Sequence, residues 1–269
     1  MSKLIRYMIK LSALLTFGIL FFIIGYVLFR GIPNLNLNLF QIEYTSSNVS
    51  LFPALVTTLM LVGLTLVVAT PIGVFTGFYL VEYAKKGNKL VEVIRIATET
   101  LSGIPSIVYG LFGMLFFVIR LGFQYSLLAG TLTAAIMVLP LIIRSTEEAL
   151  LSVDDSLREA SFGLGAGKLR TIFLIVLPVA MPGILSGIIL SIGRVVGETA
   201  ALMFTLGTAT KIPNSLFSSG RTLSLHMYLL STEGMHVNES YATGVVLLVI
   251  ILIINGLSTF LSNKLTKGK

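Results

Sequence analysis

Arg194 and Glu198 are the only ionisable residues within an otherwise apolar predicted span. An arginine at the centre of a membrane span costs about 2.5–3.5 kcal/mol on insertion scales, so it is normally kept for pairing or transport. On a continuous helix the two residues share a face, but arginine before glutamate is the weaker order and contributes only a few tenths of a kcal/mol. A planar guanidinium pairs with two oxygens at once. Arg194 is therefore suited to contact an oxyanion, with Glu198 as its counter-ion. The alternative is that Arg194 lies near the outer end of the span and reaches water, with Glu198 already among the headgroups.

Other groups that could carry chemistry are weaker candidates. Residues 163–168 suggest a phosphate-binding loop, but Phe162 and Leu169 stand where that motif needs glycine and serine or threonine. The sequence has no cysteine, which excludes disulfides, thiolate metal sites and a cysteine nucleophile. His226 and His236 are predicted to be solvated in a polar loop. The remaining acidic cluster is predicted to be a solvated surface rather than a metal site; its members are Glu147, Glu148, Asp154 and Asp155.

The composition is that of an integral membrane protein. Of 269 residues, 55% are hydrophobic and only 12% are charged, whereas a soluble domain has nearer 25% charged residues. The net charge of +7 indicates an anionic bilayer surface rather than nucleic acid, because the basic residues stand beside apolar segments.

Six apolar stretches are predicted to span the bilayer. They cover residues 12–29, 52–80, 101–119, 127–143, a region within 184–204, and 241–261. Pro178 and Pro182 are expected to break the long stretch 172–207 and leave its first part at the interface. Residues 82–100 are predicted to form a loop or surface helix, and residues 223–230 a helix lying flat.

An even number of spans places both termini on one side of the membrane. The segments on that side hold 14 basic residues and those on the other side hold four. The positive-inside rule therefore predicts cytoplasmic termini and a cytoplasmic segment 144–171.

Within that segment, residues 156–165 are predicted to form a short helix. Ser156 and Glu159 fit a capping box, and Gly165 stands where a glycine cap would end the helix. Leu157, Ala160, Ser161 and Leu164 form a weakly polar stripe that is free to press on another surface.

This segment resembles the EAA loop of ABC importer permeases: Glu-Ala-Ala, three residues, Gly, nine residues, Ile-x-Leu-Pro. The matching residues here are Glu159, Ala160, Ser161, Gly165, Ile175, Leu177 and Pro178. Only Ser161 departs from the pattern, a small residue for a small one. The resemblance implies that residues 156–165 are the coupling helix that docks on an ATP-hydrolysing subunit. The alternative is a capped interfacial helix that joins two spans and has no partner.

Residues 193–205 (GRVVGETAALMFT) resemble the PstA family, permease subunits of phosphate-specific ABC transporters. Residues 103–106, 139–150 and 241–248 also resemble that family, and the likeness covers about residues 50–260. Ala201 and Asp154 stand where the family often has proline. The partner permease shares the Arg-x-x-Gly-Glu portion but typically continues Thr-Met-Ala-Val, so the run Thr199, Ala200 and Ala201 favours PstA.

The resemblance implies an all-α, six-span type I ABC importer permease with a MetI-like fold and a cytoplasmic coupling helix. Residues 1–50 would form the N-terminal tail, first span and external loop, 51–262 the permease core, and 263–269 a basic tail. The implied function is ATP-driven import of inorganic phosphate at the cell (inner or plasma) membrane.

The implied partners are a PstC-like second permease, two PstB-like ATP-binding subunits and an external PstS-like phosphate-binding protein, besides the lipid bilayer and without nucleic acid. The chain itself would bind no cofactor, since ATP would bind the partner subunit, and it would catalyse no bond chemistry. The alternatives are import of another oxyanion such as sulfate or molybdate, a secondary phosphate transporter, and a membrane scaffold. The EAA spacing argues against the secondary transporter, and the intramembrane charges argue against the scaffold.

Overall fold

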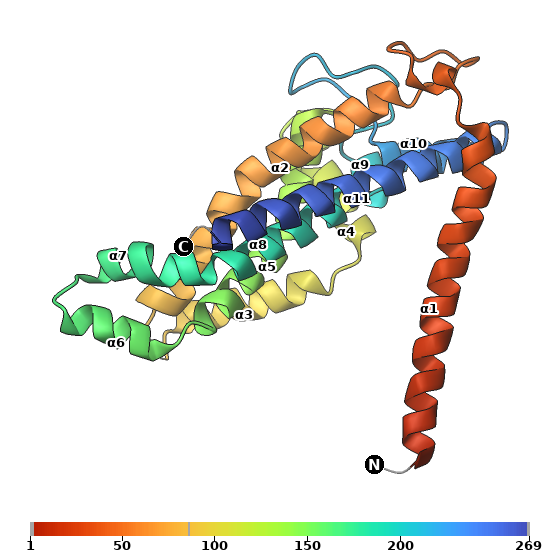
Figure 1. Cartoon of the computed structure of the whole chain (residues 1–269). Helices are drawn as coiled ribbons and strands as arrows, with labels where there is room; N and C mark the ends of the chain where they lie inside the picture. Colours follow the sequence, from red (N-terminus) through yellow and green to blue (C-terminus); the bar gives the residue numbers. More distant parts are fainter. Residues whose placement is uncertain (1–2, 86, 268–269) are drawn as a thin grey trace.

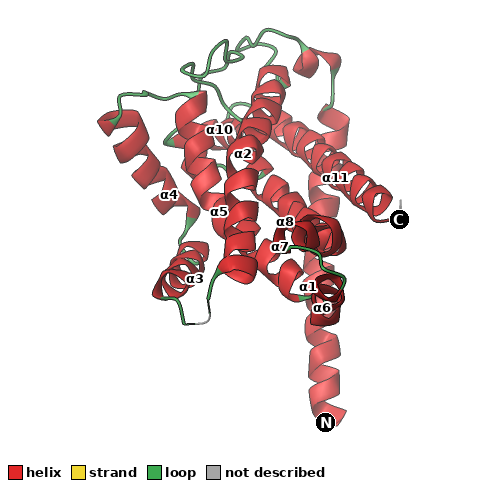
Figure 2. Ribbon diagram, turned by 90° about the vertical axis from the view of Figure 1, so that its left-hand side faces the viewer, coloured by secondary structure: helices red, strands yellow, loops and turns green. Residues whose placement is uncertain are grey.

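The computed structural model describes residues 3–85 and 87–267, and this part of the chain forms helices, turns and loops without a β-strand (Figures 1 and 2). The helices are α1 (Lys3–Gly31), α2 (Phe52–Phe78), α3 (Lys89–Ser102), α4 (Ser106–Gly113), α5 (Leu127–Leu151), α6 (Asp155–Gly163), α7 (Lys168–Thr171), α8 (Leu177–Val196), α9 (Ala200–Met203), α10 (Leu223–Glu233) and α11 (Val237–Lys267). π-helical turns cover Tyr79–Tyr83, Met114–Arg120 and Ile172–Val176, and short 3-10 turns cover Ile32–Asn34 and Leu37–Phe40. The predicted all-α class is confirmed.

Five helical stretches of the described chain are long and apolar enough to cross a membrane: Ile5–Asn34, Phe52–Tyr83, Leu127–Leu151, Lys168–Val196 and Val237–Phe260. The bent pair Lys89–Ser102 and Ser106–Arg120 provides a sixth crossing only if its two helices count as one span. This is the architecture of a multi-pass membrane protein. Four of the six predicted spans coincide with one of these unbroken stretches, and the fifth, predicted within 184–204, overlaps Lys168–Val196 only as far as Val196.

The third predicted span, residues 101–119, is wrong in its first part. Residues 101 and 102 belong to α3, and the helix axis turns by 106° before continuing from Ser106 to Arg120. Pro105 explains the bend, because proline has no N–H to donate and disfavours helical backbone in the residue before it. The predicted surface helix is thus α3, which meets α4 almost at a right angle.

The predicted break at Pro178 and Pro182 is also wrong. Lys168–Val196 is one unbroken helical stretch. Pro178 lies in the first turn of α8, directly after the π-helical turn Ile172–Val176. The wider hydrogen-bond pattern of that turn accommodates the missing proline donor, as local π adjustments do in other membrane helices.

Helix α5 is the centre of the bundle and packs against both α2 and α8. Glycine allows each close approach. A Cβ at Gly73 of α2 would lie 2.6 Å from the Ile142 side chain, and a Cβ at Gly183 of α8 would lie 2.6 Å from Ala149. Backbones that approach this closely are typical of membrane helix interfaces. They hold α2 and α8 close against α5.

Helix α1 diverges from the bundle and meets α11 only near its own C-terminal end (Figure 1). Tyr26 and Tyr241 stack edge to face there, with ring centroids 5.9 Å apart. The hairpin of α6 and α7 projects from the opposite end of the bundle, toward which the C-terminal end of α11 also points (Figure 1).

Candidate functional site

The α6–α7 hairpin begins with a cap two residues earlier than predicted. The Asp154 carboxylate accepts a hydrogen bond of 2.8 Å from the Ser156 backbone N–H, and α6 begins at Asp155. Ser156 therefore lies inside the helix, and the predicted capping box with Glu159 is wrong. Asp154 displaces it because its short carboxylate is as good an N-cap as serine and precedes the helix in a suitable extended conformation. The hydrogen bonds from Ser156 lower the pKa of Asp154.

The glycine cap is confirmed. Gly165 has a φ of +78°, which is left-handed backbone. Its N–H donates to the Phe162 carbonyl at 2.9 Å, and the Ala166 N–H donates to the Ser161 carbonyl at 3.1 Å. These two bonds form a Schellman motif, which turns the chain sharply out of α6.

The hairpin presents a free surface. No residue of α6 is buried, and Glu159 and Ala160 are exposed. Ser161 is half-buried because its hydroxyl shares a 2.8 Å hydrogen bond with the buried Thr171 hydroxyl. The exposed apolar side chains of this surface are Leu157, Phe162, Leu164 and Leu169. Leu177 and Pro178 do not belong to it, because they form the start of α8 and are half-buried there.

Arg194 and Glu198 do not lie on one helical face. Helix α8 ends at Val196, Gly197 is its cap, and α9 begins only at Ala200. No ion pair joins the two side chains in the described part of the chain. The predicted counter-ion pair is therefore wrong, because the helical register that would align the residues is interrupted between them.

Glu198 is 8% exposed and has other partners. Its carboxylate accepts hydrogen bonds from the backbone N–H groups of Thr199 at 3.2 Å and Ala201 at 3.0 Å. Its own carbonyl accepts a 2.7 Å hydrogen bond from the Ser224 hydroxyl of α10. A buried carboxylate that satisfies the first N–H groups of a helix is a cap. Glu198 thus holds the break between α8 and α9 in place.

Arg194 is half-buried in the last turn of α8, where the helix dipole favours a cation. Within the described residues its guanidinium makes no hydrogen bond or ion pair. Its charge lies within electrostatic reach of Tyr109 on α4. The five donors of this side chain are therefore available to an anion.

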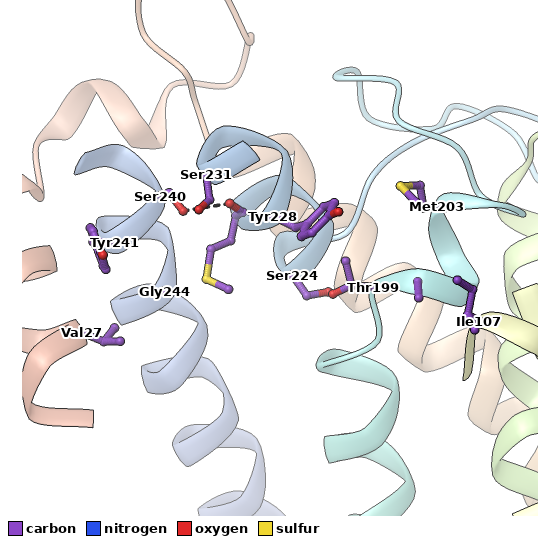
Figure 3. Close-up of a pocket in the computed structure, with 12 residues that line it drawn as sticks. Val27, Ile107, Thr199, Met203, Ser224, Tyr228, Ser231, Ser240, Tyr241 and Gly244 are labelled. Atoms are coloured by element: carbon purple, nitrogen blue, oxygen red, sulfur yellow. Dashed lines mark hydrogen bonds between the residues drawn. The ribbon is translucent and has the colours of Figure 1, made fainter. Parts of the chain in front are cut away.

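A cavity of about 500 Å³ lies where the helix break meets α10 and α11 (Figure 3). Six hydroxyl-bearing residues line it: Thr199, Ser224, Tyr228, Ser231, Ser240 and Tyr241. Arg194 is not in this lining. The sequence analysis did not single out these hydroxyls, although Ser224, Tyr228 and Ser231 repeat at helical spacing and could have been recognised as one face of α10.

The prediction that His226 is solvated is wrong. His226 is fully buried in α10, and its ring stacks edge to face with Tyr44. Arg221, also buried, lies 4.6 Å from the centre of the Tyr44 ring. Burial first, and then the Arg221 charge, lower the pKa of His226 to about 3, although the nearby Val49 carbonyl opposes them. The extended loop before α2 covers the histidine, which no local pattern signals.

The family described as "Binding-protein-dependent transport system inner membrane component" matches residues 69–267. The chain is 34% identical to the probable ABC transporter permease protein YqgI of Bacillus subtilis (strain 168), over 98% of this chain and 97% of that protein. It is 40% identical to the phosphate transport system permease protein PstA 1 of Mycobacterium tuberculosis (strain H37Rv), over 75% of this chain and 65% of that protein.

Two solved structures share the fold at low sequence identity. The bacterial alginate ABC transporter in complex with an alginate-bound periplasmic protein superposes with a TM-score of 0.68 at 18% identity, over 97% of this chain and 96% of that chain. The inward-facing MetNI methionine ABC transporter has a TM-score of 0.61 at 19% identity, over 80% and 94% of the two chains. The expected importer-permease fold is confirmed.

Proposed function

Because this chain belongs to the family of binding-protein-dependent transport system inner membrane components, we propose that it is a PstA-type permease that forms half of a pathway for inorganic phosphate. It is a permease subunit and not the enzyme, since ATP is hydrolysed by partner chains of such transporters. Relatives named as phosphate permeases support the choice of phosphate.

The observation that carries the proposal is the free guanidinium of Arg194 near an intramembrane helix break. Phosphate presents several oxygens, and the planar donors of arginine can bond two of them together. The anion would take the place that a carboxylate partner would otherwise occupy. Because Glu198 is engaged with the backbone of α9, it does not compete with phosphate for Arg194.

No covalent step is required of this chain. Transport would proceed by alternating access, in which the permease pair opens to one side and then to the other. The broken helix supports this role, since discontinuous helices at membrane depth commonly line substrate sites in transporters. Hydroxyls of the cavity beside the break can donate hydrogen bonds to an anion without adding a fixed charge.

The α6–α7 hairpin is proposed to dock on the ATPase subunits through its exposed apolar side chains. The proposed assembly adds a PstC-like permease, two PstB-like ATPases and a PstS-like binding protein. The excess of basic residues supports a cytoplasmic position for the hairpin and both termini, on the side where ATP is available. The chain is proposed to bind no cofactor of its own.

Uptake of labelled phosphate tests the proposal. The chain, tagged and expressed with its partner subunits in cells that lack another high-affinity phosphate importer, should co-purify with an ATPase and a second permease and should restore uptake. Excess sulfate or molybdate should not compete. Restored uptake of labelled sulfate or molybdate without restored phosphate uptake would instead identify the chain as a permease for that oxyanion.

A further inference from the structure

One buried ion pair fastens the α6–α7 hairpin to the rest of the protein. The Arg158 guanidinium of α6 lies 3.0 Å from the Glu82 carboxylate, and the two side chains are only 13% and 9% exposed. The same guanidinium donates to the Leu150 carbonyl at 2.9 Å and to the Val153 carbonyl at 2.8 Å. Arg158, which also lies 3.0 Å from the exposed Asp155 carboxylate of its own helix, thus ties α6 to the turn that follows α2 and to the end of α5.

Both arms of the hairpin contact the same short segment. Glu82 belongs to the π-helical turn Tyr79–Tyr83 that ends α2. The neighbouring Tyr83 ring lies 4.7 Å below the Lys168 ammonium group of α7, a cation–π contact. One arm is therefore tied to this turn by Arg158 and the other by Lys168. π-Helical turns occur frequently at functional sites.

The opposite end of α2 is tied to the helix break. The Thr58 hydroxyl of α2 accepts a 2.9 Å hydrogen bond from the Leu223 N–H at the start of α10. The next residue, Ser224, donates to the Glu198 carbonyl. A continuous series of contacts therefore runs from the hairpin, along α2 and through the start of α10 to the residue that caps α9.

We propose that α2 is a rigid helix that transmits movement of the α6–α7 hairpin to the helix break beside Arg194. Arg158 and Glu82 are the positioning residues that attach the hairpin to α2. Two N–H groups of Arg158 donate to the same Glu82 oxygen, at 3.1 and 3.0 Å, and their planar arrangement fixes the orientation of the hairpin relative to α2. The 27 residues of α2 span about 40 Å, enough to cross the membrane. This inference rests on the proposed importer function.

Single and double substitutions test the link in the assembled transporter. Arg158→Gln and Glu82→Gln should leave subunit assembly and basal ATPase activity near wild type, while phosphate taken up per ATP hydrolysed falls by about tenfold. Arg158→Gln should be the more severe single change, because Arg158 also binds the Leu150 and Val153 carbonyls, and the double variant should be no worse than Arg158→Gln alone, because Glu82→Gln then removes nothing further. Arg158→Lys keeps the charge but not the planar set of donors, so its uptake per ATP should lie between those of wild type and Arg158→Gln.

The control is the exposed pair Arg144 and Glu148, whose side chains are 63% and 65% exposed. Arg144→Gln should leave uptake per ATP unchanged.

A distance measurement separates transmission from a defect in docking. The chain has no cysteine, so Phe75→Cys on α2 and Ser156→Cys on α6 provide a unique spin-label pair, used with cysteine-free partner subunits. The distance should stay constant between nucleotide-free and ATP-bound states, and Arg158→Gln should broaden it.

Three results would overturn the link: unchanged uptake per ATP in Arg158→Gln, a loss of uptake that only follows lost ATPase subunit, or a spin-label distance that changes with nucleotide in the wild type. None of these bears on the substrate. A wild-type assembly that takes up no phosphate would overturn the proposed function instead.

Discussion

The Glu198 carboxylate lies 3.0 Å from the backbone N–H of Ala201, three residues further along the chain. This bond makes the only acidic residue of the predicted span a helix cap instead of a counter-ion. It leaves Arg194 without a protein partner in the described structure. The division of roles between the two residues leads to the first two predictions.

Arg194 should contact phosphate through its positive charge and two of its N–H donors together. Uptake should therefore decrease from wild type to Arg194→Lys and then to Arg194→Gln, which should lose at least about tenfold because a charge-assisted contact is lost. Labelled phosphate uptake, normalised to the amount of protein in the membrane, measures this order. Near-normal uptake by Arg194→Gln would mean that the side chain only reaches toward the membrane surface.

The role of Glu198 as a helix cap should depend on its acceptor oxygen more than on its negative charge. Glu198→Gln keeps the oxygen that receives the Ala201 N–H, so uptake should be reduced only mildly. Glu198→Leu leaves buried N–H groups without a partner and should cost about 1 kcal/mol or more in stability. Thermal unfolding of the purified chain and phosphate uptake should both distinguish the two variants. Equal loss in both would instead indicate that the negative charge is required.

Gly165→Val should uncouple the α6–α7 hairpin from the ATPase subunit. A β-branched residue at a φ of +78° adds strain of about 1–2 kcal/mol, which would redirect the chain between α6 and α7. The variant should insert into the membrane normally but lose phosphate uptake and bind the ATPase subunit weakly. Co-purification and uptake measure the two effects. Gly163→Ala is the matched control, because Gly163 lies within α6 and has open space around it.

The hairpin and the loop after α9 should face opposite sides of the membrane. Because the chain has no cysteine, Ser156→Cys and Ser215→Cys each give a single reactive thiol at an exposed position. An impermeant thiol reagent should label Ser215→Cys in intact cells and Ser156→Cys only after lysis. Labelling of Ser156→Cys from outside would reverse the proposed orientation and remove the ATPase-docking role.

Acid should destabilise the protein through His226. Its pKa is about 3 in the folded chain and about 6.5 in an unfolded one. Between these values the unfolded chain binds more protons than the folded chain. The free energy of unfolding is therefore highest above pH 6.5 and decreases as the pH falls toward 3. At pH 5 the loss is about 2 kcal/mol.

His226→Leu should remove this pH dependence, while His236→Leu, at a half-exposed position, should keep it. Thermal unfolding in nanodiscs between pH 7 and pH 5 makes the comparison. A pH dependence of the free energy of unfolding that survives in His226→Leu would assign it to other residues.

Local patterns predicted the features that depend on few neighbours. Apolar length located the spans, and the position of Gly165 predicted its left-handed cap. The prediction failed where distant contacts decide the structure. The break after Val196 is fixed by Ser224, far along the chain, and His226 is covered by a loop near Tyr44. Asp154 shows a local failure, because two adjacent residues compete as caps and the sequence does not rank them.

The bend at Pro105 also changes the barrier that a charged solute meets. The helix beyond it comprises the eight residues of α4 and the seven of its π-helical turn, about 22 Å at 1.5 Å per residue, against a hydrocarbon core of about 30 Å. A span this short is matched by thinning the adjacent bilayer. It also packs directly on α9, since a Cβ at Gly110 would lie 2.7 Å from the Ala201 Cα. We therefore expect the low-dielectric layer to be thinner beside the helix break, which would shorten the distance over which an anion must travel without water.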